Sequence, residues 1–203
     1  AENCNGGNDN RSASQPYTVP VFANFTLIGP PPGAWETPSG NYGMMLRRGV
    51  GGLYVNGVVA RYSKAGISLR GEQTFARHEE GRLRVRNIYF ADNGAIFQAP
   101  GGTGEGAQYA LDLGANALEA GNVATANLFA AFPLNTQNAT AADFDWTPAA
   151  GSPIATGGLT DFSGLPQELR NAAGSFVTPT AYRGAADPSG PRWWEGWTYY
   201  SRF

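Results

Sequence analysis

The sequence predicts an all-β protein, a short parallel β-helix of about three to four rungs with long loops and one or two short helices. A repeat of about 30 residues, built from short strands, is the first observation behind this prediction. The second is a content of 28 glycines and 14 prolines among 203 residues, which favours short strands and turns over helices. A chain of this length suits one all-β domain.

The repeat is aligned on three asparagines, in VFANFTLIG from Val21, LYVNGVVARY from Leu53 and LRVRNIYFADNG from Leu83. Asn24, Asn56 and Asn87 each have an apolar residue two positions earlier and a β-rich apolar stretch after them. Propeller blades would require tight hairpin dipeptides at blade spacing, and the sequence does not show them at that spacing. In a parallel β-helix, equivalent asparagines stack, so the three are predicted to form a ladder of hydrogen-bonded amides. The alternative is that they are turn residues at similar spacing by chance.

The chain is predicted to have three parts. Residues 1–20 form a polar N-terminal arm, residues 21–160 form the rungs with their loop insertions, and residues 161–203 form a C-terminal capping segment. The alanine-rich residues 107–132 are the predicted place of the short helices, although Gly114 and Gly121 interrupt them. Cys4 is the only cysteine, so no internal disulfide can form.

The composition excludes several classes of partner. A net charge of −2 gives no electrostatic reason to expect nucleic acid. No apolar run approaches the ~20 residues of a membrane span. A single lysine, together with abundant asparagine, glycine, threonine and serine, predicts a secreted protein at the cell surface or outside the cell.

The search for catalytic groups gives no site. His78 is the only histidine and is predicted to be a solvated loop residue, so neither a histidine-based triad nor a multi-histidine metal site is expected. Asp143 and Asp145 are the closest acid pair at alternating spacing, and they are predicted to bond their own turn. The sequence therefore predicts no catalytic residues, no metal, no cofactor and no enzymatic activity.

Two C-terminal stretches resemble a known family. DFDWTPAAGSPIATGG, from Asp143 to Gly158, and YRGAADPSGPRWWEGWT, which begins at Tyr182, resemble the end of secreted bacterial right-handed parallel β-helix proteins of uncharacterised role. There a Tyr-Arg-Gly-Ala stretch precedes a Trp-x-x-Gly-Trp-Thr ending, which this chain matches from Trp193, whereas Ala186 replaces the usual aromatic residue. The resemblance implies a right-handed coil and says little about activity. Family members carry further rungs upstream, so the first rung here is expected to present an open parallel edge.

The aromatic tail suggests how the solenoid ends. Its large rings are predicted to cap the last rung or to form an interface with a neighbouring subunit. These residues are Trp193, Trp194, Trp197, Tyr199, Tyr200 and Phe203.

A head-to-tail contact between two different ends does not close on itself and builds a filament. The predicted function is therefore a non-enzymatic extracellular structural protein that assembles as a homo-oligomer, a filament or a surface layer. The alternative is a carbohydrate-binding or adhesin module whose tryptophans stack on sugars. A polysaccharide lyase or hydrolase rests on analogy of fold alone.

Asparagine-linked glycosylation is a further expectation. Asn10 and Asn138 lie in Asn-x-Ser/Thr sequences within polar loops and are the candidate sites, whereas the same motif at Asn24 falls in the predicted ladder.

Overall fold

The structure is a computed structural model and describes residues 2–5, 15–30, 40–133, 138–196 and 198. Its described part consists mainly of strands, with two α-helices and short 3-10 turns. The strands are β1 (Glu2–Asn5), β2 (Val21–Ala23), β3 (Thr26–Ile28), β4 (Tyr42–Arg47), β5 (Gly52–Val55), β6 (Val58–Ala60), β7 (Ala65–Arg70), β8 (Leu83–Arg86), β9 (Tyr89–Ala91), β10 (Gln108–Tyr109), β11 (Glu119–Ala120), β12 (Phe129–Ala131) and β13 (Asp145–Pro148). The helices are α1 (Glu72–Glu79) and α2 (Gln167–Ala173).

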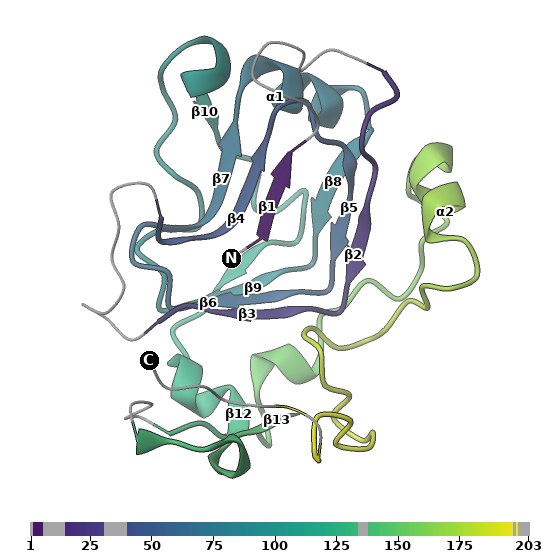
Figure 1. The fold of residues 1–203 in the computed structure, drawn as a ribbon. Helices are drawn as coiled ribbons and strands as arrows, with labels where there is room; N and C mark the ends of the chain where they lie inside the picture. Colours follow the sequence, from purple (N-terminus) through teal and green to yellow (C-terminus); the bar gives the residue numbers. More distant parts are fainter. Residues whose placement is uncertain (1, 6–14, 31–39, 134–137, 197, 199–203) are drawn as a thin grey trace.

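Three sheets of parallel strands surround a common core (Figure 1). Sheet A contains β1, β4 and β7, sheet B contains β2, β5 and β8, and sheet C contains β3, β6 and β9. Each strand pairs with the strand three places later in the chain, as in the register Phe22–Tyr54–Val85 of sheet B. One coil of the chain therefore contributes one strand to each sheet, and the next coil stacks on it. These stacked parallel strands fit the predicted β-helix.

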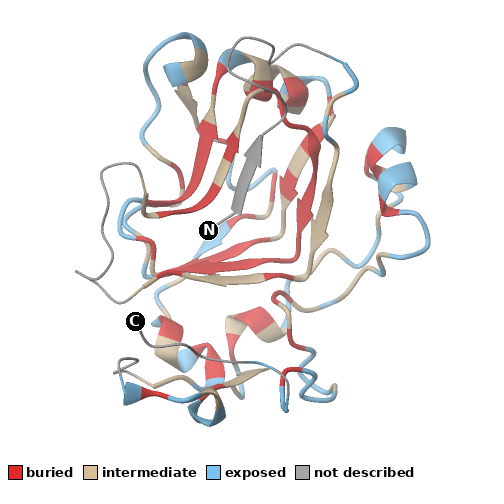
Figure 2. Cartoon of the chain, in the orientation of Figure 1, coloured by how far each residue is buried: buried red, intermediate tan, exposed pale blue. Residues whose placement is uncertain are grey.

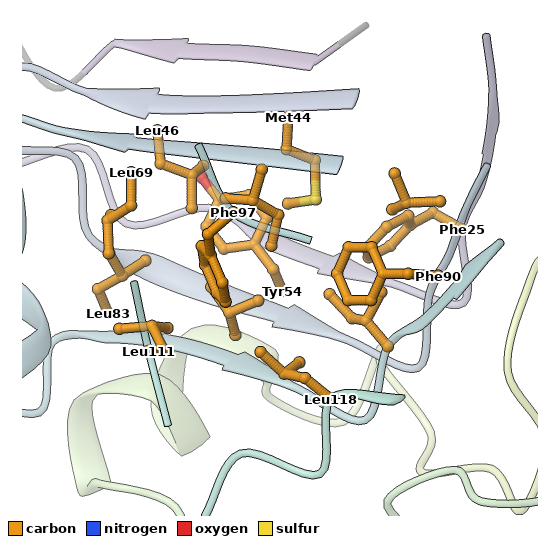
Figure 3. Close-up of a cluster of buried hydrophobic side chains, with 14 of the residues drawn as sticks. Phe25, Met44, Leu46, Tyr54, Leu69, Leu83, Phe90, Phe97, Leu111 and Leu118 are labelled. Atoms are coloured by element: carbon orange, nitrogen blue, oxygen red, sulfur yellow. The ribbon is translucent and has the colours of Figure 1, made fainter. Parts of the chain in front are cut away.

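The core fills the space between the sheets because side chains alternate along each strand. Met44 and Leu46 of β4 point inward, as do Tyr54 of β5 and Phe90 of β9, and none of the four is more than 2% exposed (Figure 3). Phe25 packs over the backbone of Gly57, where a Cβ would approach its ring to 2.3 Å. This close fit explains why the second coil has glycine after its asparagine, where the first coil has phenylalanine.

The last coil is closed by the segment that follows β9. Phe97 forms a parallel bridge with Ile67 of β7, and Leu111 and Leu118 complete the apolar cluster at this end. Figure 3 shows these three side chains within the same core as Leu69 and Leu83. Residues between β9 and β11 therefore cover the end that the sequence assigned to the aromatic tail.

Both α-helices lie outside the alanine-rich segment, so their predicted place in residues 107–132 is wrong. That segment instead contains β10, β11 and β12, where β10 and β11 pair with β7 and β9. His78, predicted to be a solvated loop residue, is half-buried in α1. The reason is that the residues after Gly71 favour a helix, and Thr74 and Arg77 of that helix are buried. None of the described helices has the length and apolarity needed to cross a membrane.

The outer faces of two sheets are covered by the C-terminal half of the chain. Leu165, just before α2, and Leu169 of α2 pack on Leu53 and Val55 of sheet B. The β12–β13 hairpin and Ile154 cover sheet C. The first-coil strands β2 and β3 contribute to the same outer faces and lie at the end of the stack.

Candidate assembly interface

The strands of the first coil are the outermost strands of their sheets in the described part of the chain. The sheet orders place β1, β2 and β3 each at an end. Every residue of β2 and β3 is half-buried, whereas every residue of β5 and β6 one coil later is fully buried. Figure 2 shows this change along the stack. The first coil therefore has accessible surface on the side that faces away from β5 and β6.

The backbone of the first coil has a defined polarity. Pro20 accepts a hydrogen bond from Leu53 at 2.8 Å, and the Asn24 N–H donates to Val55 at 3.1 Å. In a parallel strand, successive residues direct their N–H and C=O groups to opposite sides. The backbone groups of Val21 and Ala23 therefore face away from the second coil.

The same reasoning applies to sheet C. Phe25 accepts from the Val58 N–H at 2.8 Å, and the Gly29 N–H donates to Ala60 at 2.8 Å. Thr26 and Ile28 consequently direct their backbone groups away from the second coil. No described strand pairs with that side of β3.

The three asparagines occupy the corner between sheets B and C, here called the asparagine corner. Asn24, Asn56 and Asn87 each follow a strand of sheet B and have left-handed φ angles of 51°, 56° and 53°. Asparagine tolerates this conformation better than other residues that have a Cβ. The backbone N–H of Asn56 donates to Arg86 of the next coil, as that of Asn24 donates to Val55.

The side chains of the asparagine corner bind the C-terminal segment. Asn56 is fully buried, donates to the Thr180 hydroxyl at 3.1 Å and accepts from the Leu159 N–H at 2.6 Å. Asn24 also donates to the Thr180 hydroxyl, at 2.8 Å, and Asn87 donates to the Gly157 carbonyl at 2.9 Å. Thus the described hydrogen bonds of these amides run to the C-terminal segment, not from one asparagine to the next as the predicted ladder required.

A fourth position of the asparagine corner contains Ala117. Its φ is 50°, and the preceding Asn116 accepts from the Asn87 N–H at 3.0 Å, as Val55 accepts from Asn24. Sequence alignment on asparagine missed this coil because alanine stands at the aligned position. Only the left-handed backbone identifies it.

We expect Ala117→Asn to raise the free energy of unfolding by about 1 kcal/mol, because alanine in a left-handed conformation costs about 1–2 kcal/mol. Urea denaturation followed by circular dichroism measures the change. Ala120→Asn, at an exposed position of β11 without a left-handed backbone, is the matched control and is expected to give no gain. Equal effects of the two substitutions would contradict the assignment.

The C-terminal segment runs from the third coil back to the first. Gly157 lies at Asn87 of the third coil, and the Ala185 N–H donates to the Thr26 hydroxyl of the first at 3.0 Å. Arg183, buried, donates to Gly157 at 3.0 Å and forms an ion pair with Glu119 of β11 at 2.7 Å. Residues 157–159 and 180–185 therefore form a strap along the outside of the asparagine corner, and the chain between them leaves the corner to form α2 on sheet B.

The strap brings two of the predicted tail residues to the first coil. Trp194 is 3% exposed and Trp193 is 48% exposed, with their rings 5.9 Å apart in an edge-to-face arrangement. Together with Trp146, they line an apolar cavity of about 280 Å³, here called the tryptophan pocket. Its other described lining residues are Thr26, Ile28, Ala185 and Thr198. The sequence placed these tryptophans over the last rung, but they lie beside β3 of the first coil.

Comparison with known proteins identifies the family. The family model described as a pectate-lyase-like β-helix domain matches residues 1–147. The chain belongs to this family. The predicted β-helix is thereby confirmed, whereas the right-handed sense and the specific tail motif stay predictions. Searches of curated proteins and of solved structures gave no match.

The remaining predicted sites of this pectate-lyase-like β-helix are distributed as follows. Trp197, Tyr199, Tyr200, Phe203 and Asn10 lie outside the described residues. Asn138 is exposed, as a glycosylation site requires, and its modification stays a prediction.

The acid pair considered for catalysis is engaged in local structure. Asp143 accepts from the N–H and hydroxyl of Thr140, at 2.7 and 2.8 Å. Asp145 accepts from the Thr147 N–H at 3.0 Å and forms an ion pair with Arg192. The bonds to Thr140 and Thr147 agree with the predicted turn roles, whereas the ion pair with Arg192 joins Asp145 to a distant part of the chain. Among the residues that the structure places, no cluster of three or more acidic, histidine or cysteine side chains could bind a metal.

His78 and Tyr89 are two of the ionisable groups whose pKa is shifted by their surroundings. Burial, assisted by the Arg84 guanidinium, lowers the pKa of His78. Burial, assisted by the Glu119 carboxylate, raises the pKa of Tyr89. Both shifts favour the neutral form. His78 and Tyr89 belong to different elements, α1 and β9, and neither lines the tryptophan pocket.

Proposed function

We propose that this chain is a non-enzymatic extracellular structural module, a right-handed solenoid whose first coil accepts the end of another β-helix segment. A second copy joined head to tail is the simplest partner and would extend into a filament or a surface layer. The observation that carries the proposal is the half-buried state of β2 and β3, whose counterparts β5 and β6 are fully buried.

The hydrogen-bonding pattern supports the same proposal. The backbone groups of Val21, Ala23, Thr26 and Ile28 face the side where no described strand pairs with β2 or β3. An edge of this kind is a template for strand addition. At the other end of the stack, β11 lies at the end of sheet C, and its residues Glu119 and Ala120 are exposed. Strand β11 is therefore the part of sheet C that a head-to-tail contact would bring against β3.

A carbohydrate-binding role is the second candidate, supported by one observation. Trp193 is 48% exposed at the tryptophan pocket, which leaves part of its ring available for stacking on a sugar. Trp194 is 3% exposed, and its packing on the same molecule supports a structural role instead.

The substitution Ala23→Pro tests the assembly. Proline removes an N–H that faces away from the second coil, so the fold should tolerate it while strand addition is blocked. We expect light scattering after size-exclusion chromatography to show concentration-dependent association of the natural chain, electron microscopy to show elongated particles, and Ala23→Pro to abolish both.

The matched control is Ala23→Ser, which retains the N–H and should associate like the natural chain. Circular dichroism checks that all three proteins are folded. A natural chain that stays at 21.5 kDa across micromolar concentrations would contradict the proposal.

A further inference from the structure

The tryptophan pocket lies at the edge strand of sheet C. Of that sheet, only β3 contributes to the described lining, through Thr26 and Ile28. The equivalent outward side chains of the second coil, Val58 and Ala60, are instead fully buried under the β12–β13 hairpin region. The pocket therefore belongs to the first coil and adjoins the accessible edge of β3.

Thr26 and Ile28 belong both to the lining of the pocket and to the hydrogen-bonding edge of β3. The side chains of Thr26 and Ile28 line the pocket, and their backbone groups face away from the second coil. Neighbouring strands of a sheet lie about 4.8 Å apart, with side chains in register on each face. A strand added to β3 would thus place its outward side chains beside Thr26 and Ile28, at the rim of the pocket.

The chemistry of the pocket favours an apolar side chain. Described polar groups of the lining already bond within the molecule: the Trp193 indole N–H donates to Ala185 at 2.8 Å, and the Thr198 hydroxyl donates to Trp194 at 2.7 Å. The nearby Arg192 is paired with both Asp145 and Glu195. A ligand rich in hydroxyls would find few partners here, whereas aromatic rings are suited to burying an apolar group.

We propose that the tryptophan pocket receives a large apolar side chain of a polypeptide strand that pairs in parallel with β3. This inference rests on the proposed function, because the strand is the one that the first coil accepts. The backbone of β3 supplies the hydrogen bonds, and the pocket selects the residue opposite Ile28. In the register of the stack, that is the residue equivalent to Ala60 of the second coil.

The corner restricts the partner strand further. Each coil in the described part of the chain places a left-handed residue two positions before its strand in sheet C, at Asn24, Asn56, Asn87 and Ala117. A strand that follows the same path is favoured by asparagine or glycine there, since alanine, as at Ala117, adopts this conformation at a cost. The favoured partner is therefore a coil of another β-helix segment with asparagine or glycine at the corner and a large apolar residue four positions later. Strand β11 of a second copy does not meet this description, because Ala117 and Gly121 stand at the two positions.

Synthetic peptides based on the second coil test the inference. The probes are GLYVNGVVAR (residues 52–61) and its variants Ala60→Phe and Ala60→Ser. We expect isothermal titration calorimetry with the natural chain to give at least ~10-fold tighter binding of the phenylalanine peptide than of the serine peptide, from the transfer of one aromatic side chain out of water. Trp193→Ala in the protein should remove this difference while the serine peptide still binds. Phe176→Ala, a 95% exposed position outside the pocket, is the control and should leave the difference unchanged.

The outcomes separate the inference from the proposed function. Equal binding of all three peptides, lost in Ala23→Pro, would overturn the pocket inference and leave the edge as a site of strand addition. No binding of any peptide would overturn both. A soluble glucan oligosaccharide that binds the natural chain and not Trp193→Ala, with no discrimination among the peptides, would overturn the inference in favour of a glycan.

Discussion

Asn56→Ala is expected to lower the free energy of unfolding by about 2–5 kcal/mol, since it leaves a buried polar group unpaired and puts alanine in a left-handed conformation. The amide of Asn56 is fully buried and accepts from the Leu159 N–H at 2.6 Å while it donates to Thr180. The substitution therefore breaks the strap away from the middle coil. Urea denaturation monitored by circular dichroism measures the loss.

Asn56→Gly separates the two causes. Glycine adopts the φ of 56° without strain but loses the same hydrogen bonds, so it should recover about 1 kcal/mol of the loss. If both variants retained the stability of the natural chain, the strap would contribute nothing to the fold.

Phe97→Ala should lower the free energy of unfolding by about 3–5 kcal/mol, the usual cost of truncating a buried phenylalanine. Phe97 is 9% exposed and closes the last coil together with Leu111 and Leu118. The cavity that its removal creates lies at the end of the stack, next to Ile67, with which Phe97 forms a bridge.

Phe176→Ala is the matched control, because Phe176 is 95% exposed and its truncation should change stability by less than about 0.5 kcal/mol. Equal effects of the two substitutions in thermal or urea denaturation would contradict the closure of the last coil by residues that follow β9.

The repeat was predictable because each coil has the same local constraint. A left-handed residue between two short strands selects asparagine, and this choice leaves a visible period at Asn24, Asn56 and Asn87. At Ala117 the same backbone conformation occurs without the favoured residue, so the period disappears from the sequence although the coil continues. The sequence pattern therefore reveals the left-handed corner position only where asparagine occupies it.

The path of the tail could not be predicted in the same way. The contact between Asn24 and Thr180 joins residues 156 positions apart and depends on single hydrogen bonds, which leave no period in the sequence. An aromatic tail indicates burial but not the surface that is buried. Helix α1 was missed for another reason, since its short polar sequence resembles a loop and Thr74 and Arg77 become buried only by packing on the coil.

The strap also explains why the two ends of the stack differ. Residues that follow β9 close the last coil within the core, whereas the strap returns Trp193 and Trp194 to the outside of the first coil. The described part of the tail therefore lies beside β3 and lines the tryptophan pocket, and no described strand of it pairs with the edge of β3. That arrangement lets the first coil combine a hydrogen-bonding edge with an apolar pocket.

Amide hydrogen exchange by nuclear magnetic resonance tests the accessible first-coil edge most directly. In dilute protein, the N–H groups of Ala23 and Thr26 should exchange rapidly, whereas that of Asn24, bonded to Val55, should be protected. At higher concentration the Ala23 and Thr26 amides should become protected as molecules associate. Strong protection of all three amides at every concentration would show that the edge is already occupied within one molecule, and would contradict the account.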